Sequence, residues 1–283
     1  MQEGQFTGFK VAIDSSGIAW IEFNEPERLN GMSIAKKRDL IEVLTQAQMD
    51  NAIRVIIFIG QGRAFCAGDN LKGYTSQAPD SKLLPSIPPG HDNALGTYNS
   101  LRHISQELNL TVRKLDKLTI AAINGIAIQT GLSLALACDF KIAADTARLG
   151  SATLRFGLLP DEGGHYLLLE HLGLVKTMQF LMRKTIATAN EALELGLVNE
   201  VVAEAQLRQR VTELAVELSE GPQVAMRMLK RSLYQATSMS FEQACEDIAS
   251  RTAITDHHAD AREGGNSFRE KRSPVFNRWL DDA

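Results

Sequence analysis

Two adjacent carboxylates, Asp161 and Glu162, stand in the segment FGLLPDEGGHYLL, with a proline before them and a glycine pair after them. An acid just ahead of a helix start can cap free N–H groups and suits the positive end of the helix dipole. A carboxylate in apolar surroundings can instead act as a general base, because desolvation disfavours its charged form. The pair therefore has two interpretations, helix capping and proton transfer.

Other reactive side chains point to no second chemistry. The segment GLSLA around Ser133 matches a serine-nucleophile turn only in part, and no Asp and His follow it in a supporting pattern. The pair His257 and His258 has no partner at metal-ligand spacing, so no metal site is expected. His165, close to Asp161 in sequence, is interpreted as an ordinary core or surface histidine.

Composition limits the function classes. A chain of 283 residues with 44% hydrophobic residues can bury a large core. The net charge of −4, with no basic stripe, disfavours nucleic acid as a partner. The N-terminus MQEGQFTGFK lacks an apolar signal region, so a cytoplasmic protein is expected. Three widely spaced cysteines without a CxxC pair fit a reducing compartment: Cys66, Cys138 and Cys245.

The elements that would position the acids follow an α/β pattern. Residues 10–26 alternate around a Ser-Ser-Gly turn and predict a hairpin, and Ser33 is a candidate cap for the helix after it. RVIIFIG and TIAAING are short apolar runs that end in glycine, which favours buried parallel strands. The uncharged segment Leu118–Cys138 could suggest a membrane helix, but its central Asn, Gly, Gln and Thr residues favour strand, turn and buried helix.

Two further regions complete the layout. The stretch from Tyr74 to Ser100 contains four prolines and no sustained period, so a long surface loop is expected there. From about Asn190 the sequence becomes helical. The predicted organisation is a core at residues 1–189 and a helical C-terminal module at 190–283.

Six motifs in order resemble the crotonase (enoyl-CoA hydratase/isomerase) superfamily and span nearly the whole chain: NEPERLNGMS, AFCAGDNLK, AAINGIAIQTGLSLALACD, GLLPDEGG, ALELGLVNEVV and FREKRSPVF. This resemblance implies an α/β fold, a crotonase-like spiral of ββα turns with a helical C-terminal oligomerisation module. It also implies an acyl-CoA thioester substrate, no permanently bound cofactor, and a homotrimer or dimer of trimers. No membrane or nucleic-acid partner is expected.

By the same resemblance, two backbone N–H groups, those of Asp69 and Thr130, form an oxyanion hole for the thioester oxygen. Losing one such donor typically costs on the order of 3 kcal/mol of barrier. The family usually has glycine where this chain has Gln129 and Thr130, residues that resist positive φ. That departure affects the shape of the loop and the room for the thioester.

The hydratase acids of the family are missing here, since their positions hold Ser133 and Thr153. Asp161 lies eight residues past the second position, where several isomerases and aryl-CoA dehalogenases of the family keep an acid. GLLPDEGG is most similar to the isomerase branch. Asp161 is therefore the expected base, with Glu162 as its rival or as a helix cap.

The resemblance also implies the contacts with coenzyme A. Cations suit its phosphates, and an aromatic ring from a neighbouring subunit could pack near its adenine. The expected CoA or substrate contacts are Arg28, Ala67, Asp69, Asn70, Leu71, Lys72, Lys271 and Phe276.

Three functions are open at this point. The first is an enoyl-CoA double-bond isomerase with Asp161 as base. The second is an enoyl-CoA hydratase or hydrolase in which Asp161 or Glu162 activates water. The third, of another class, is a non-catalytic CoA-ester-binding or RNA-binding homologue, against which the acidic balance counts.

Overall fold

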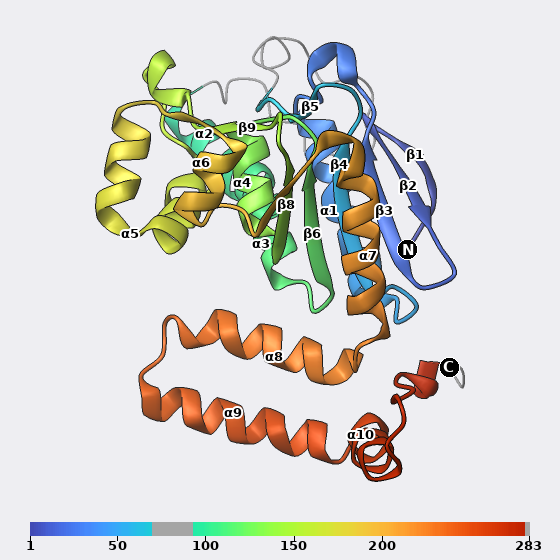
Figure 1. Ribbon diagram of the computed structural model, residues 1–283. Helices are drawn as coiled ribbons and strands as arrows, with labels where there is room; N and C mark the ends of the chain where they lie inside the picture. The colour runs from blue at the N-terminus through green and yellow to red at the C-terminus, as the bar shows by residue number, and fades with distance from the viewer. Residues whose placement is uncertain (70–92, 281–283) are drawn as a thin grey trace.

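The computed structural model describes residues 1–69 and 93–280 and contains two β-sheets surrounded by helices (Figure 1). The larger sheet has the strand order β1 (Gly4–Phe6), β2 (Phe9–Ile13), β3 (Ile18–Phe23), β4 (Val55–Gly60), β6 (Leu118–Ile123), β8 (Phe140–Ala144) and β11 (Glu200–Val202). The smaller sheet has the order β10 (Ile186–Thr188), β9 (Arg148–Gly150), β7 (Ile126–Ile128) and β5 (Ala64–Cys66). From β3 to β11 all pairings in the larger sheet are parallel, as the apolar runs predicted.

The larger sheet is covered on both faces. Every residue of β4 is buried, because alternate side chains enter two separate hydrophobic clusters. Ile56 and Phe58 pack with α1 (Ile34–Met49), α3 (Gln106–Lys114) and α4 (Thr130–Ala137). Val55 and Ile57 pack on the other face against α7 (Leu207–Glu220) (Figure 1).

The local signals near the N-terminus are confirmed. β2 and β3 pair antiparallel across a turn in which Gly17 has φ +76° and its N–H donates to the Asp14 carbonyl. The Ser33 side chain accepts from the Lys36 N–H at 3.1 Å and caps α1.

The uncharged segment 118–138 folds as predicted, with β6, a turn, β7 and the buried helix α4 in succession. Asn124 lies in the turn between β6 and β7, and Gln129 lies between β7 and α4. Among the described helices, none combines the length and apolarity needed to cross a bilayer.

The prediction of a loop from Tyr74 to Ser100 is wrong at its C-terminal end. Asn93 accepts from the Gly96 N–H at 3.0 Å and caps α2 (Ala94–Ser100), which continues through residues 101–105 into α3. An Asn residue is a common N-cap, so Asn93 signalled the start of a helix. The prolines before it led to the loop prediction. Residues 74–92 lie outside the described part of the chain.

Helices dominate the C-terminal region. α5 (Gly164–Met182) and α6 (Ala189–Leu195) precede β11, and α7 is followed by α8 (Gln223–Ala236), α9 (Phe241–Asp256) and α10 (Ala259–Glu270). Asp139 attaches α8 to the core: it accepts from the Thr119 N–H at 2.8 Å, from Lys230 Nζ at 2.7 Å and from the Tyr234 hydroxyl at 2.8 Å. These contacts give Asp139 a structural role. The three last helices lie beyond one end of the larger sheet, and β5 lies at the other (Figure 1).

Candidate active site

The site forms where two loops meet at the ends of β5 and β7. These strands pair in parallel, so both chain segments leave the smaller sheet on the same side. A Cβ atom at Gly131 would lie 2.0 Å from the Cys66 carbonyl oxygen, so only glycine allows the start of α4 to approach β5 this closely. The segments that hold Asp69 and Thr130 are therefore neighbours.

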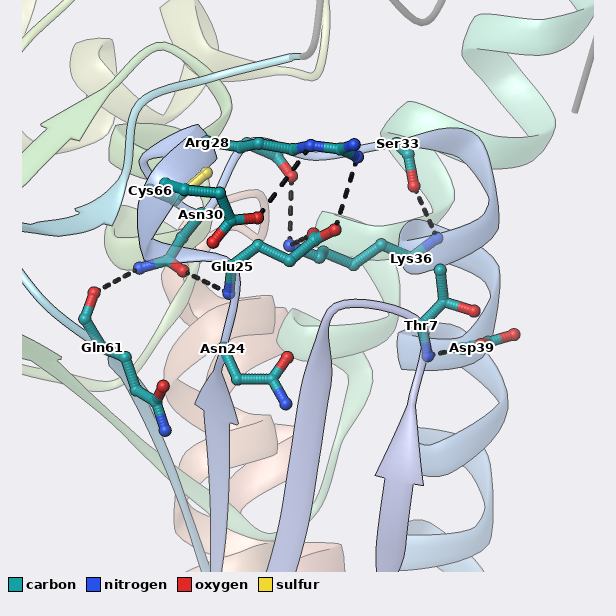
Figure 2. Close-up of polar contacts among 12 residues, drawn as sticks. Thr7, Asn24, Glu25, Arg28, Asn30, Ser33, Lys36, Asp39, Gln61 and Cys66 are labelled. Carbon is teal, nitrogen blue, oxygen red and sulfur yellow. Dashed lines mark hydrogen bonds and ion pairs between the residues drawn. The ribbon is translucent and has the colours of Figure 1, made fainter. Parts of the chain in front are cut away.

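The NEPERLN motif holds the first of these loops (Figure 2). Asn30 is fully buried, and its side chain accepts from the Glu25 N–H at 3.0 Å and donates to the Gln61 and Ala64 carbonyls at 3.0 and 2.7 Å. The Ala67 N–H then donates to the Leu29 carbonyl. The motif thus fixes the path of the chain from the end of β4 into the turn before Asp69.

A buried ion pair follows that turn. Lys37, 1% exposed on α1, lies 2.7 Å from Asp69 Oδ2 and donates to Ser105 Oγ at 2.8 Å. Removing one partner of such a pair leaves an uncompensated buried charge. Lys37 therefore places a positive charge directly against the Asp69 carboxylate.

The second loop contains an unusual backbone conformation. Gln129 has φ +53° and ψ −112°, in a position where the family resemblance led us to expect glycine. Such a conformation costs of order 1–3 kcal/mol and persists only where the surrounding structure holds it. The Gln129 N–H donates to the Gly150 carbonyl, and its side chain donates to Glu162 Oε2 at 2.9 Å and accepts from Ser151 Oγ at 3.0 Å.

The side chains of Asp69, Thr130 and Glu162 form one continuous polar chain. Thr130 Oγ1 lies 2.7 Å from Asp69 Oδ1 and also contacts Glu162 Oε1. Glu162 is only 2% exposed. The acid segment is thereby attached to both loops.

The two acids differ in environment. Asp161 is half-buried, and desolvation followed by the nearby charge of Asp69 raises its pKa above the ordinary range. Burial, then the charges of Asp69 and Asp161, raise the pKa of Glu162 to about 7. Both carboxyls are therefore stronger bases than solvated ones.

Helix α3 supports this segment through the backbone. Gln106 donates to the Asp161 carbonyl and Asn109 to the Glu162 carbonyl, both at 3.0 Å. The cap of α5 is Gly163 (φ +89°), and no described side chain caps it. The capping interpretation is wrong for Glu162, because its carboxylate turns inward to Thr130 and Gln129 instead of to the helix N–H groups.

Ser133 and Thr153, at the hydratase-acid positions expected from the resemblance, differ in their surroundings. A Cβ atom on Gly164 would lie 2.5 Å from Ser133 Oγ, so this hydroxyl lies against the start of α5. Thr153 begins a short 3-10 turn, and its buried hydroxyl has no hydrogen-bond partner among the described residues. His165 Nδ1 lies 3.0 Å from the Pro160 carbonyl oxygen, a contact within its own segment.

The structure describes some of the expected CoA contacts and leaves others outside its described residues. Arg28 is exposed, 3.7 Å from a Glu25 oxygen, and Ala67 is half-buried in the first loop. Asn70, Leu71 and Lys72 lie outside the described residues.

Lys271 and Phe276 belong to the C-terminal segment, and Asn277 attaches that segment to residues 221–223. Arg54, just before β4, donates to the Ser219 carbonyl at 3.3 Å, so this attachment lies where the parallel strands begin. The structure does not bring Lys271 and Phe276 to the two loops within one chain.

Comparisons with known proteins identify the family. A family model described as Enoyl-CoA hydratase/isomerase matches residues 14–278. This chain belongs to the enoyl-CoA hydratase/isomerase family.

Relatives of this family differ in their named activities. A 1,2-epoxyphenylacetyl-CoA isomerase of Escherichia coli (strain K12) is 31% identical over 95% of this chain and 98% of its own length. A hydroxycinnamoyl-CoA hydratase-lyase of Pseudomonas fluorescens is 30% identical over 96% and 95%. The crystal structure of an enoyl-CoA hydratase from Bacillus anthracis superimposes with a TM-score of 0.86 at 28% identity, over 95% of this chain and 99% of that one. The predicted crotonase-like fold, with its helical C-terminal region, is thus confirmed.

Several residues of this enoyl-CoA hydratase/isomerase site were not among the sequence predictions: Lys37, Ser105, Gln106, Asn109 and Gln129 as a side-chain donor. Lys37 had one available signal. It shares the buried face of α1 with Leu40 and Leu44, three and seven residues further on. A lysine at helical spacing with core leucines indicates a buried partner.

Proposed function

We propose that this enzyme isomerises the double bond of an enoyl-CoA thioester, with Asp161 as the base and the N–H groups of Asp69 and Thr130 as the oxyanion hole. The observation that carries the proposal is the set of acids at the site. Asp161 is half-buried with a raised pKa, whereas the two hydratase-acid positions hold hydroxyls. Coenzyme A takes part only as a portion of the substrate.

The proposed reaction needs only one proton acceptor. Asp161 removes a proton from the carbon next to the double bond, and the electron pair delocalises into a dienolate whose negative charge rests on the thioester oxygen. The same carboxyl returns the proton to another carbon of the dienolate. Because the group is desolvated, its proton affinity is closer to that of a general base working near neutral pH.

The position of the two loops supports the oxyanion hole. Thr130 is the first residue of α4, where backbone N–H groups have no partner within the helix and the dipole favours negative charge. The contact of 2.7 Å between Thr130 Oγ1 and Asp69 Oδ1 places the two N–H-bearing residues side by side.

Water activation by Asp161 or Glu162 is the second candidate, because relatives include a hydratase-lyase and Glu162 has a pKa of about 7. Incubation of acyl-CoA thioesters in heavy water separates the two reactions by mass spectrometry. Isomerisation replaces carbon-bound hydrogen by deuterium without adding atoms to the thioester. Hydration instead adds the elements of water. In a second incubation, in oxygen-labelled water, a product that carries the labelled oxygen would overturn the isomerase proposal.

Crotonyl-CoA is expected to be hydrated only feebly. Hydration needs one group to deprotonate water and another to protonate the α-carbon, and neither Ser133 nor Thr153 is an effective base near neutral pH. The double variant Ser133→Glu with Thr153→Glu is expected to raise this activity. Loss of enoyl-thioester absorbance measures it, and rapid hydration by the unmodified protein would show that another carboxylate, Glu162 first, reaches the β-carbon.

A homotrimer or dimer of trimers is expected in solution. Large apolar side chains remain exposed on α5 and on the last helices, and burial against other subunits would remove them from water. They include Leu174, Val175, Met178, Leu229, Leu233, Phe241 and Phe268. Light scattering at micromolar concentration measures the mass, and a monomer would contradict the expectation.

A further inference from the structure

The Thr130 hydroxyl contacts two carboxylates but has only one proton to donate. Its oxygen lies 2.7 Å from Asp69 Oδ1 and also contacts Glu162 Oε1. If both acids were ionised, one of these contacts would bring two acceptor oxygens together without a hydrogen between them. The geometry therefore requires a second proton in this cluster.

We propose that Glu162 holds this second proton in the resting enzyme and acts as a positioning residue, which locks the Gln129–Thr130 turn to Asp69 through the Thr130 hydroxyl. Glu162 is then not the base. This inference rests on the proposed function in one respect, because the turn it locks is the one that supplies an oxyanion-hole N–H group.

One assignment of hydrogens satisfies every contact in the chain. Lys37 donates to Asp69 Oδ2, and the Thr130 hydroxyl donates to Asp69 Oδ1. The protonated Glu162 Oε1 donates to Thr130 Oγ1, and Glu162 Oε2 accepts from Gln129 Nε2 at 2.9 Å. From Gln129 through Glu162 and Thr130 to Asp69 each group donates to the next, and Lys37 donates to Asp69 from the other end.

The surroundings decide which acid is protonated. Lys37 lies 2.7 Å from Asp69 and stabilises its charge. Glu162 is 2% exposed and faces the negative charges of Asp69 and Asp161, with Lys37 as the more distant cation. In the described part of the chain, the side chains from α3 and α4 that hydrogen-bond to Glu162 are neutral: Asn109 and Thr130. The proton therefore belongs on Glu162.

The lock acts on a residue with an unfavourable backbone conformation. Gln129 has a positive φ without being glycine, and its amide is held between Glu162 and Ser151. Deprotonation of Glu162 would place two like charges on either side of Thr130 and remove one hydrogen bond. The Gln129–Thr130 turn would then lose part of the hydrogen bonding that holds its conformation.

Infrared spectroscopy tests the proton directly. The wild-type protein at pH 5.5 is expected to show the carbonyl band of a buried carboxylic acid, which disappears in Glu162→Gln and fades as the pH rises through about 7. Thr130→Ser, which keeps the hydroxyl, should leave the band in place. Thr130→Val, which removes it, should shift the band to higher frequency. Absence of a Glu162 band at pH 5.5 would overturn the proposal.

Thermal unfolding provides a second readout. A carboxyl with a raised pKa in the folded state stabilises fully below its unfolded pKa and loses that contribution as the pH rises through about 7. Between pH 5 and pH 7.5 the wild-type Tm should therefore fall by roughly 5 °C more than that of Glu162→Gln, whose amide donates to Thr130 at every pH. Identical profiles would count against a protonated Glu162.

Both measurements are independent of the substrate. If heavy-water exchange showed no isomerisation but the Glu162 band and the Tm difference were present, the proposed function would fail and the proton assignment would stand. If exchange occurred but both spectroscopic and thermal signatures were absent, only the role of Glu162 would fail.

Discussion

Asp161→Asn is expected to lower the turnover of the isomerisation by at least ~100-fold, the lower range for loss of a positioned base. The amide has the same shape as the carboxyl but cannot accept the proton from carbon. Because Asp161 is held through its backbone carbonyl by Gln106, the fold and the binding of the CoA ester should be retained. Single-turnover rates and calorimetric binding of the thioester measure the two effects separately.

Glu162→Gln is the matched control for this prediction. Its amide can replace the protonated carboxyl in the contacts with Thr130 and Gln129, so this variant should lose far less turnover at pH 6 than Asp161→Asn. Near wild-type turnover of Asp161→Asn would exclude it as the base. The reversed order, with Glu162→Gln the slower variant, would assign the base to Glu162.

Lys37→Met is expected to lower the free energy of unfolding by about 3–5 kcal/mol, the usual cost of removing one partner of a buried ion pair. Asp69 would then lose the cation that lies 2.7 Å from its Oδ2 atom. Chemical denaturation measures the loss. The added charge imbalance should also loosen the loop that provides the Asp69 N–H, so turnover should fall as well.

Two variants test the origin of this effect. Lys10→Met removes an ion pair of similar length, 3.2 Å to Glu22, but at a site where Lys10 is 38% exposed, so its cost should stay below about 1 kcal/mol. Lys37→Met combined with Asp69→Asn removes both charges and should recover much of the lost stability. Equal losses of unfolding free energy in the Lys10 and Lys37 variants would show that the buried pair stabilises the fold no more than the exposed pair does.

Periodicity and turn chemistry determined the individual elements. The apolar run of β4 has no polar face, which is compatible only with burial on both sides, and Ser33 marks the start of α1 because its hydroxyl can accept a free N–H. The same kind of signal was misread at Asn93, where prolines upstream concealed a helix start. Local patterns therefore located most elements, and competing local patterns caused the error.

The sequence by itself also determined which residue types are available for chemistry: an acid pair at 161–162 and hydroxyls at 133 and 153. Only the tertiary structure decided how the two acids differ. Glu162 turns inward to Thr130 and Gln129, whereas Asp161 stays half-exposed, because α3 and α4 reach the segment from distant parts of the chain. Burial, charge and shared protons depend on contacts between residues far apart in sequence, and no local pattern contains them.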